Sequence, residues 1–127
     1  MEVKIKLKNP EETVRKVKDL GATFKVRLVQ IDRYFNAPKT LKEFEKTDEA
    51  LRIRTTQEFS FDSDEMRIKS HDITYKGPKL DKKIKSRIEH ICKIENPQNM
   101  IKILEALDFS QVISIKKVRE VYLLKYK

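Results

Sequence analysis

The sequence predicts an α+β fold: one curved antiparallel sheet, made of two β-α-β halves, with helices packed outside it. Polar and apolar residues alternate with a period of two in residues 1–8 and 50–55, which is typical of strands with one packed face. Two Asn-Pro pairs are each followed by apolar residues at helical spacing, which indicates two helices. No glycine-rich turn joins a strand to a helix, so the parallel sheet of a dinucleotide-binding fold is not expected.

The first helix is expected to begin at Asn9 and to end at Gly21. Asn9 is a suitable N-cap, Pro10 fits the first turn, and glycine is common just past a helix end. After it we expect a strand at 24–35, a loop or short helical segment at 37–48, a strand at 50–55 and a loop at 59–70 that can include a short strand. A strand at 72–76, closed by Gly77 and Pro78, a charged connection at 79–85 and a strand at 87–95 follow. The second helix is expected from Asn96, with the apolar face Met100, Ile103, Leu104 and Leu107, and a strand at 112–126 comes last.

An internal repeat organises these elements. Asn9 and Asn96 lie 87 positions apart, and each is followed by Pro, a helix and a further strand. At this offset Gln30 corresponds to Lys117. We therefore expect one domain over residues 1–127, with repeat halves at about 1–60 and 72–127.

The composition favours an anionic partner. The 127 residues include 29 Lys and Arg against 20 Asp and Glu, a net charge of +9, which suits phosphate groups, nucleic acid or an anionic membrane. No apolar run approaches the ~20 residues that span a bilayer, so no membrane partner is expected. Cys92 is the single cysteine and is expected in the core, and His71 and His90 lack the spacing of zinc ligands. The absence of a disulfide pair fits a cytoplasmic protein.

The polar positions of the predicted strands form one constellation: Glu2, Lys4, Lys6, Arg52, Arg54, Lys76, Arg87, Glu89, Lys93, Lys117 and Arg119. If these faces converge in one concave sheet, the cations need an anion to neutralise them, and a polyphosphate chain would do so. Carboxylates there are suited to Mg²⁺ or Mn²⁺, which bridge phosphate oxygens. The alternative is an exposed basic outer surface, and the pattern alone leaves both open.

The order of motifs resembles the CYTH family, which comprises class IV adenylate cyclases, thiamine triphosphatases and related triphosphate tunnel enzymes. The matching stretches are Glu2-Val3-Lys4-Ile5-Lys6, Gln30-Ile31-Asp32-Arg33-Tyr34-Phe35, Leu51-Arg52-Ile53-Arg54, Thr74-Tyr75-Lys76-Gly77, Arg87-Ile88-Glu89-His90-Ile91 and Lys116-Lys117-Val118-Arg119. The resemblance implies an antiparallel β tunnel or barrel, either closed or left open and incomplete, that binds a triphosphate on a basic wall and a divalent metal through acidic residues.

Three departures limit what the resemblance implies. Lys4 and Ile91 stand where the family has glutamates, and the chain ends at Lys127, where family members continue with further strands. Phosphate binding is therefore better supported than catalysis. Three alternatives follow from the missing strands. The sheet is an open trough, or a partner chain covers its edge, as in a homodimer, or the chain is a fragment of a longer protein.

The assigned roles follow from this combination of pattern and resemblance. The catalytic candidates are Lys6 and Arg54, the substrate-binding candidates are Lys4, Lys6, Arg52, Arg54, Lys76, Arg87, Lys117, Arg119 and Tyr34, and the metal candidates are Glu2 and Glu89. Asp32 is expected to position substrate or to pack at the rim. A register error of one residue would exchange Lys117 for Lys116.

Two functions from different classes are predicted. The first is metal-dependent triphosphate hydrolysis or ATP cyclisation, with Mg²⁺ or Mn²⁺ as cofactor. The alternative is a catalytically impaired module that binds triphosphate, polyphosphate or RNA ends. General nucleic-acid binding is a weaker third hypothesis. It predicts aromatic residues interleaved with basic residues on an outer face, and Tyr34, Tyr75 and Tyr122 are too far apart in the sequence to support that pattern.

Overall fold

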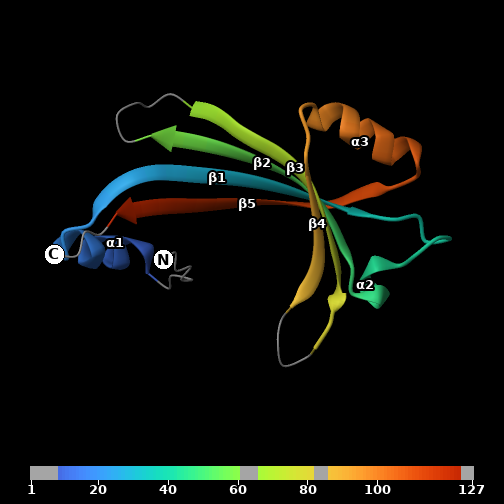
Figure 1. Cartoon of the computed structure of the whole chain (residues 1–127), viewed down its shortest axis with the longest axis horizontal. Coiled ribbons are helices and arrows are strands. Elements are labelled where there is room, and N and C mark those ends of the chain that lie inside the picture. Colours follow the sequence, from blue (N-terminus) through green and yellow to red (C-terminus); the bar gives the residue numbers. More distant parts are fainter. Residues whose placement is uncertain (1–8, 61–65, 82–85, 124–127) are drawn as a thin grey trace.

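The structure is a computed structural model that describes residues 9–60, 66–81 and 86–123. Its elements are α1 (Pro10–Asp19), β1 (Thr23–Asn36), α2 (Phe44–Thr47), β2 (Ala50–Ser60), β3 (Met66–Lys79), β4 (Arg87–Lys93), α3 (Pro97–Ala106) and β5 (Ser110–Leu123) (Figure 1). The strand predicted at residues 1–8 lies outside the described residues. Of the described helices, none has the length and apolar character needed to cross a membrane.

The five described strands form one antiparallel sheet in the order β4-β3-β2-β1-β5. The first four strands along the chain are neighbours in turn, and β5 returns after α3 to pair with β1 on its other side. Within the described ranges β4 and β5 are the two edges, so the sheet is open there. Figure 1 shows its twist, with β4 running across the direction of β1 and β5. The predicted antiparallel α+β class is confirmed.

Both longer helices begin as the sequence predicts. The side chains of Asn9 and Asn96 each accept a hydrogen bond from the backbone N–H three residues later, at 3.2 and 3.0 Å. Each helix has proline in its first turn. Beyond each helix one residue has a positive φ, 89° at Gly21 and 67° at Asp108, which is the left-handed conformation common after a helix end.

The repeat has a geometric counterpart in the pairing of β1 with β5. The two strands have the same length, 14 residues, and their bounds lie 87 positions apart. Gln30 of β1 pairs with Lys117 of β5, and these two residues are also equivalent under the repeat. An approximate twofold axis relating the two strands therefore passes through this pair.

The hydrophobic core lies between α3 and one face of the sheet. Phe35 of β1, Ile53 of β2 and Leu104 of α3 are buried together, with Phe35 and Ile53 almost inaccessible to solvent. The partly buried residues around them are Leu51, Ile73, Ile94, Met100, Ile101 and Phe109. Because odd-numbered residues of β1 and β2 point to this core, their even-numbered neighbours point to the opposite face.

The apolar face predicted for the second helix is partly wrong. Leu104 is buried and Met100 packs against the core, as expected, and Ile101 packs there as well. Ile103 and Leu107 are instead 53% and 60% exposed. The sheet contacts a narrow side of α3, so the helical pattern alone overestimates the width of the packed face.

Two strand boundaries differ from the predictions. The sequence pattern predicts a loop at residues 59–70 that can include a short strand; in the structure β2 continues to Ser60, and the strand that begins at Met66 is the start of the longer β3. Gly77 and Pro78 are expected to end a strand, yet β3 runs through them to Lys79. The pairing of β3 with β4 shifts register between Lys76 and Lys79, so a local irregularity accommodates the proline, which has no N–H to give to a ladder.

The prediction that Cys92 belongs to the core is wrong. Cys92 is an exposed free cysteine on β4. Its neighbour Ile91 is also 63% exposed. β4 is an edge strand of the described sheet, and a period-two pattern cannot tell an edge strand from a central one.

Candidate functional site

The strand register places the predicted polar residues on the face of the sheet opposite α3. Directly opposed residues of an antiparallel pair project to the same face. Asp32 of β1 pairs with Arg54 of β2, and Arg54 pairs in turn with Asp72 of β3. Asp72 pairs with Lys93 of β4. One row therefore crosses four strands with alternating negative and positive charge.

We call this surface the charged face. Its residues are Gln30, Asp32, Tyr34, Arg52, Arg54, Asp72, Thr74, Lys76, Glu89, Lys93, Lys117 and Arg119. Among these described residues six are cations and three are carboxylates, so the face carries an excess of three positive charges. The sequence pattern predicts that a ligand neutralises the cations. In the structure, carboxylates of the chain itself neutralise part of them.

Asp32 lies at the centre of the charged face and is inaccessible to solvent. Arg54 donates two hydrogen bonds to it, from Nε to Oδ1 at 2.7 Å and from a terminal nitrogen to Oδ2 at 2.9 Å. Lys117 Nζ lies 3.4 Å from Oδ2. One carboxylate of β1 therefore holds cations from both neighbouring strands, β2 and β5.

These contacts keep Asp32 ionised. Burial by itself would raise the pKa of Asp32, but the hydrogen bonds from Arg54 and the charges of Arg54, Arg52 and Lys117 bring the pKa below its usual value. The pKa of Arg54 is raised, chiefly by its hydrogen bonds to Asp32. The pair is therefore fully charged at neutral pH.

A second chain of contacts runs beside the first. Arg52, which is buried, donates to Thr74 Oγ1 at 3.4 Å, and Thr74 donates to Asp72 Oδ1 at 2.9 Å. Arg52 Nε and Gln30 Oε1 are buried and have no hydrogen-bond partner among the described residues. Buried polar atoms normally have a partner, so these two atoms are exceptions to that rule within the described ranges.

The β4 side of the charged face is more open. Lys76 Nζ lies 3.8 Å from Glu89 Oε1, and the two side chains are 30% and 44% exposed. Lys93 is exposed. Arg119 is half-buried on β5, opposite Leu28. Lys76 and Lys93 are in wider contact with solvent than Arg52 and Arg54.

The structure does not bring Arg87 to this cluster. Its guanidinium donates to Asp48 Oδ1 at 3.0 Å, to the Asp48 carbonyl at 2.9 Å and to the Gly77 carbonyl at 3.1 Å. It therefore ties the end of β3 to the segment after α2. Tyr34, by contrast, lies on the charged face opposite Arg52.

Three candidates from the first strand, Glu2, Lys4 and Lys6, lie outside the described residues. The catalytic assignment of Lys6 and the metal assignment of Glu2 therefore stay predictions. Lys117 is placed on the charged face, whereas Lys116 pairs with Ile31 and faces the other way. This placement resolves the alternative register.

Three polar residues of the charged face, Asp72, Thr74 and Gln30, are absent from both the predicted constellation and the candidate site residues. Asp32 is also outside the constellation, and only a substrate-positioning or rim-packing role is expected for it. A signal for the first two is present, because residues 72, 74 and 76 are polar at a period of two within one strand. No signal along the sequence pairs Asp32 with Arg54, since the contact depends on the register between β1 and β2.

The described residues do not make a metal site by themselves. In the described part of the chain no group of three His, Cys, Asp or Glu side chains is placed to hold a metal ion. The oxygens of Asp32 are engaged by Arg54 and Lys117, and Glu89 lies beside Lys76. The metal pair of Glu2 and Glu89 stays a prediction, because only Glu89 belongs to the described ranges.

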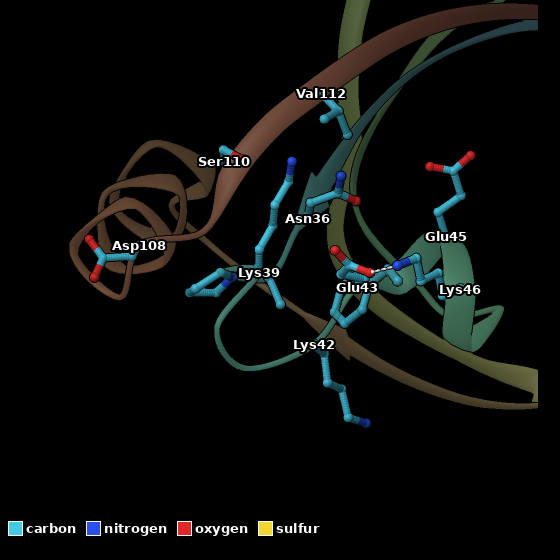
Figure 2. Close-up of a pocket in the computed structure, with 12 residues that line it drawn as sticks. Asn36, Lys39, Lys42, Glu43, Glu45, Lys46, Asp108, Ser110 and Val112 are labelled. Carbon is cyan, nitrogen blue, oxygen red and sulfur yellow. Dashed lines mark ion pairs between the residues drawn. The ribbon is translucent and has the colours of Figure 1, made fainter.

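A pocket of about 550 Å³ lies at the end of β1 (Figure 2). It is bordered by the end of β1, the loop leading to α2, α2 itself and the start of β5. Two of its lining residues, Lys46 and Glu43, form an ion pair at 2.6 Å. None of the candidate residues lines it. A smaller pocket, of about 390 Å³, touches the charged face at Lys93.

Glu49 forms a separate network on the other side of the sheet. Tyr75 donates a short hydrogen bond of 2.5 Å to Glu49 Oε2, and Lys42 Nζ lies 3.0 and 3.1 Å from the two oxygens. The hydrogen bonds from Tyr75, Thr47 and Lys42 lower the pKa of Glu49 to about 2. Tyr75 also stacks on His90. This network fastens the segment after α2 to β3.

Comparison with known proteins finds relatives that align with most of this chain. A Methanocaldococcus jannaschii protein named "Putative adenylate cyclase MJ0240" is 38% identical over 122 residues, which is 96% of this chain and 62% of that protein. The solved structure of the PH1819 protein from Pyrococcus horikoshii is 32% identical with a TM-score of 0.70, over 92% of this chain and 61% of the other. The PH1012 protein from Pyrococcus horikoshii is 28% identical with a TM-score of 0.59, over 90% and 58%.

This chain thus spans about three fifths of the length of these relatives. Residues 1–127 match the CYTH domain family. The match covers the whole chain, and the sheet order and the motifs on the charged face are in accord with it. The chain belongs to the CYTH domain family.

Proposed function

We propose that the charged face binds the phosphate chain of a triphosphate or polyphosphate. The observation that carries this proposal is the convergence of Arg54 and Lys117 from different strands, with Arg52 beside them, around a single buried carboxylate. Guanidinium groups bind phosphate oxygens through paired hydrogen bonds, and lysine adds a point charge. Family membership supports the same ligand class.

The cations are spread across more than one strand. The charged face has cations on β4 (Lys93), β3 (Lys76), β2 (Arg54) and β5 (Lys117), and β4 and β5 lie four interstrand spacings apart, about 19 Å along the sheet. An extended polyanion can contact such a row at several points, whereas a single phosphate can contact only part of it. We therefore infer a preference for linked phosphates over orthophosphate.

The proposed activity is metal-dependent triphosphate hydrolysis or ATP cyclisation. The name of the Methanocaldococcus jannaschii relative supports cyclisation, and the basic wall suits either reaction, because both build charge on phosphoryl oxygens. Mg²⁺ or Mn²⁺ would add further charge neutralisation when bound. The residues of this chain would bind and orient the phosphate chain, with Arg54 and Arg52 as the least mobile donors.

The second candidate function is binding without turnover. It is favoured by Lys4 and Ile91, which stand at positions that the family motifs give to glutamates. It is also favoured by Asp32, whose oxygens are engaged by cations of the chain itself. In this case the charged face would hold a triphosphate, a polyphosphate or a triphosphorylated RNA end.

One experiment separates these functions. The purified chain is mixed with tripolyphosphate, ATP or orthophosphate, each with and without Mg²⁺ or Mn²⁺, and its thermal unfolding and the reaction products are followed together. Stabilisation by tripolyphosphate or ATP with product release supports the enzyme, and stabilisation without product supports the binding module. No stabilisation by any triphosphate would contradict both.

Lys117 and Lys116 supply a matched pair of variants for this test. The substitutions Lys117→Gln and Lys116→Gln remove the same charge from adjacent positions, but only Lys117 projects to the charged face. We expect Lys117→Gln to weaken tripolyphosphate binding about tenfold, as for a lost charged hydrogen bond of about 1.5 kcal/mol, and Lys116→Gln to change it little. Equal effects would indicate a diffuse attraction by net charge.

A further inference from the structure

We propose that Asp32 is a positioning residue, a built-in anion that holds Arg54 and Lys117 in place for a linear polyphosphate before that ligand arrives. This inference rests on the proposed function, because it concerns the same face. It differs from the role expected from the sequence, in which Asp32 positions substrate or packs at the rim. Asp32 is fully buried and both of its oxygens are engaged by cations.

The geometry of the Arg54 contact carries the first step. Both hydrogen bonds to Asp32 come from Nε and one terminal nitrogen, at 2.7 and 2.9 Å. A guanidinium has five N–H donors, so this paired contact fixes the plane of the group and leaves other N–H donors for a ligand. The side chain of Arg54 is 16% exposed, which keeps part of it open to the charged face.

The second step is the contact with Lys117. Its ammonium group lies 3.4 Å from Asp32 Oδ2 and its side chain is 38% exposed. Lysine has a flexible four-carbon stem, so without Asp32 it could occupy many positions in solvent. Asp32 lies on β1, between β2 and β5, and its carboxylate therefore holds one cation from each of these two strands.

The third step concerns the free energy of ligand binding. Like charges brought together without a ligand repel one another, and ordering two long side chains on binding reduces affinity. A fixed carboxylate between them offsets the repulsion and orders the side chains in advance. The same carboxylate also repels a bound phosphate, so Asp32 helps binding only if the gain from positioning exceeds that repulsion.

This balance gives a test with opposite signs. Asp32→Asn makes the face more positive, so if Asp32 acts only as a repelling charge, the variant should bind tripolyphosphate more tightly. If Asp32 positions the cations, the variant should bind tripolyphosphate at least tenfold more weakly despite its extra positive charge. The control is Glu120→Gln, which removes the same charge from the opposite face of the sheet, where Glu120 pairs with Arg27, and leaves the hydrogen bonds between Arg54 and Asp32 intact. It should bind as well as the original chain or better.

A second measurement separates positioning from loss of fold. The affinity for tripolyphosphate is compared with that for orthophosphate, in chains whose folded fraction is checked by circular dichroism. Partial unfolding lowers both affinities by the same factor, whereas loss of positioning lowers the tripolyphosphate affinity more and reduces the ratio. If Asp32→Asn does not fold, Arg54→Lys is used, because it keeps the charge and loses the paired contact; the same fall in the ratio is expected.

The outcomes remain distinct from those of the proposed function. If the original chain does not bind tripolyphosphate, the proposed function is wrong. If the original chain binds and Asp32→Asn binds equally or more tightly, the positioning role is wrong while phosphate binding stands. If Asp32→Asn does not fold and Arg54→Lys keeps the original ratio, the positioning role is also wrong.

Discussion

At the scale of single residues, the pair of Asp32 and Arg54 shows how a buried charge is tolerated. Asp32 has no solvent contact, so its charge is compensated by two hydrogen bonds from Arg54 and by the nearby ammonium of Lys117. Removing one partner of such a pair leaves an uncompensated buried charge, which costs more than the pair contributes in net terms.

The first prediction follows from this asymmetry. Arg54→Ala should lower the free energy of unfolding by about 3 kcal/mol, as measured by urea denaturation at neutral pH. Arg27→Ala is the matched control, because Arg27 also pairs with a carboxylate, Glu120 at 3.4 Å, but its side chain is 52% exposed. An exposed pair is worth less than about 1 kcal/mol. Similar losses in the two variants would contradict the buried-pair argument.

The second prediction concerns Glu49 and pH. Its pKa is about 2 in the folded chain against 4.5 ordinarily, so its contribution to stability is fully present above pH 4.5 and is lost as the pH falls toward 2. The unfolding free energy of the original chain should fall over this range. Glu49→Gln should show a smaller fall, because a glutamine does not titrate. Glu11→Gln, on the exposed surface of α1, serves as control and should keep the full fall.

At the scale of elements, α3 matters because it covers the face of the sheet that the site does not use. Its contact with β1 and β2 is centred on Leu104, which packs against Phe35 and Ile53. By filling one face with apolar side chains, α3 leaves the other face of the same strands to charged residues. The alternation of side chains along the strands and the position of α3 therefore together determine which face of the sheet is charged.

The third prediction tests this contact. Leu104→Ala should lower the unfolding free energy by about 2–5 kcal/mol, the range for truncation of a buried leucine. Ile103→Ala, one residue away but 53% exposed, should change it by less than about 0.5 kcal/mol. The two free energies are measured by chemical denaturation. Equal effects would mean that the packed face of α3 is wider than the structure shows.

At the scale of the whole molecule, the net charge of +9 and the open sheet act together. The charged face carries an excess of three positive charges within the described ranges. Long-range attraction brings an anion to the molecule, whereas the fixed donors of Arg52 and Arg54 determine where it binds.

The fourth prediction separates these two contributions with salt. Between about 0.1 M and 1 M salt the screening length falls from about 10 Å to about 3 Å. The thermal stabilisation by orthophosphate should be lost over this range, while part of the stabilisation by tripolyphosphate should persist through direct contacts. The measurement is the shift of the unfolding midpoint at each salt concentration, with sucrose as a neutral co-solute control. Complete loss for both anions would indicate binding by screening-sensitive attraction alone.

The sequence by itself determined the local structure of this protein. Asn9 and Asn96 predict helix starts because their side chains cap within three residues, and alternating residues such as Leu51 and Arg52 predict strands because successive side chains point to opposite faces. These signals depend only on neighbouring residues, so they predict helices and strands without any knowledge of which strands pair. The family resemblance rests on the same local motifs and is confirmed by the match over residues 1–127.

Only the tertiary structure decided which of the polar residues meet. The contact of Asp32 with Arg54 and Lys117 depends on the register of β1 against β2 and β5, and a shift of β1 by one residue would place Asp32 on the face opposite Arg54 and Lys117. Arg87 has the same charge and the same strand pattern, yet a local irregularity between β3 and β4 leaves it bound to Asp48. Register and edge position arise from pairing between distant segments, and for that reason the pattern along one strand does not contain them.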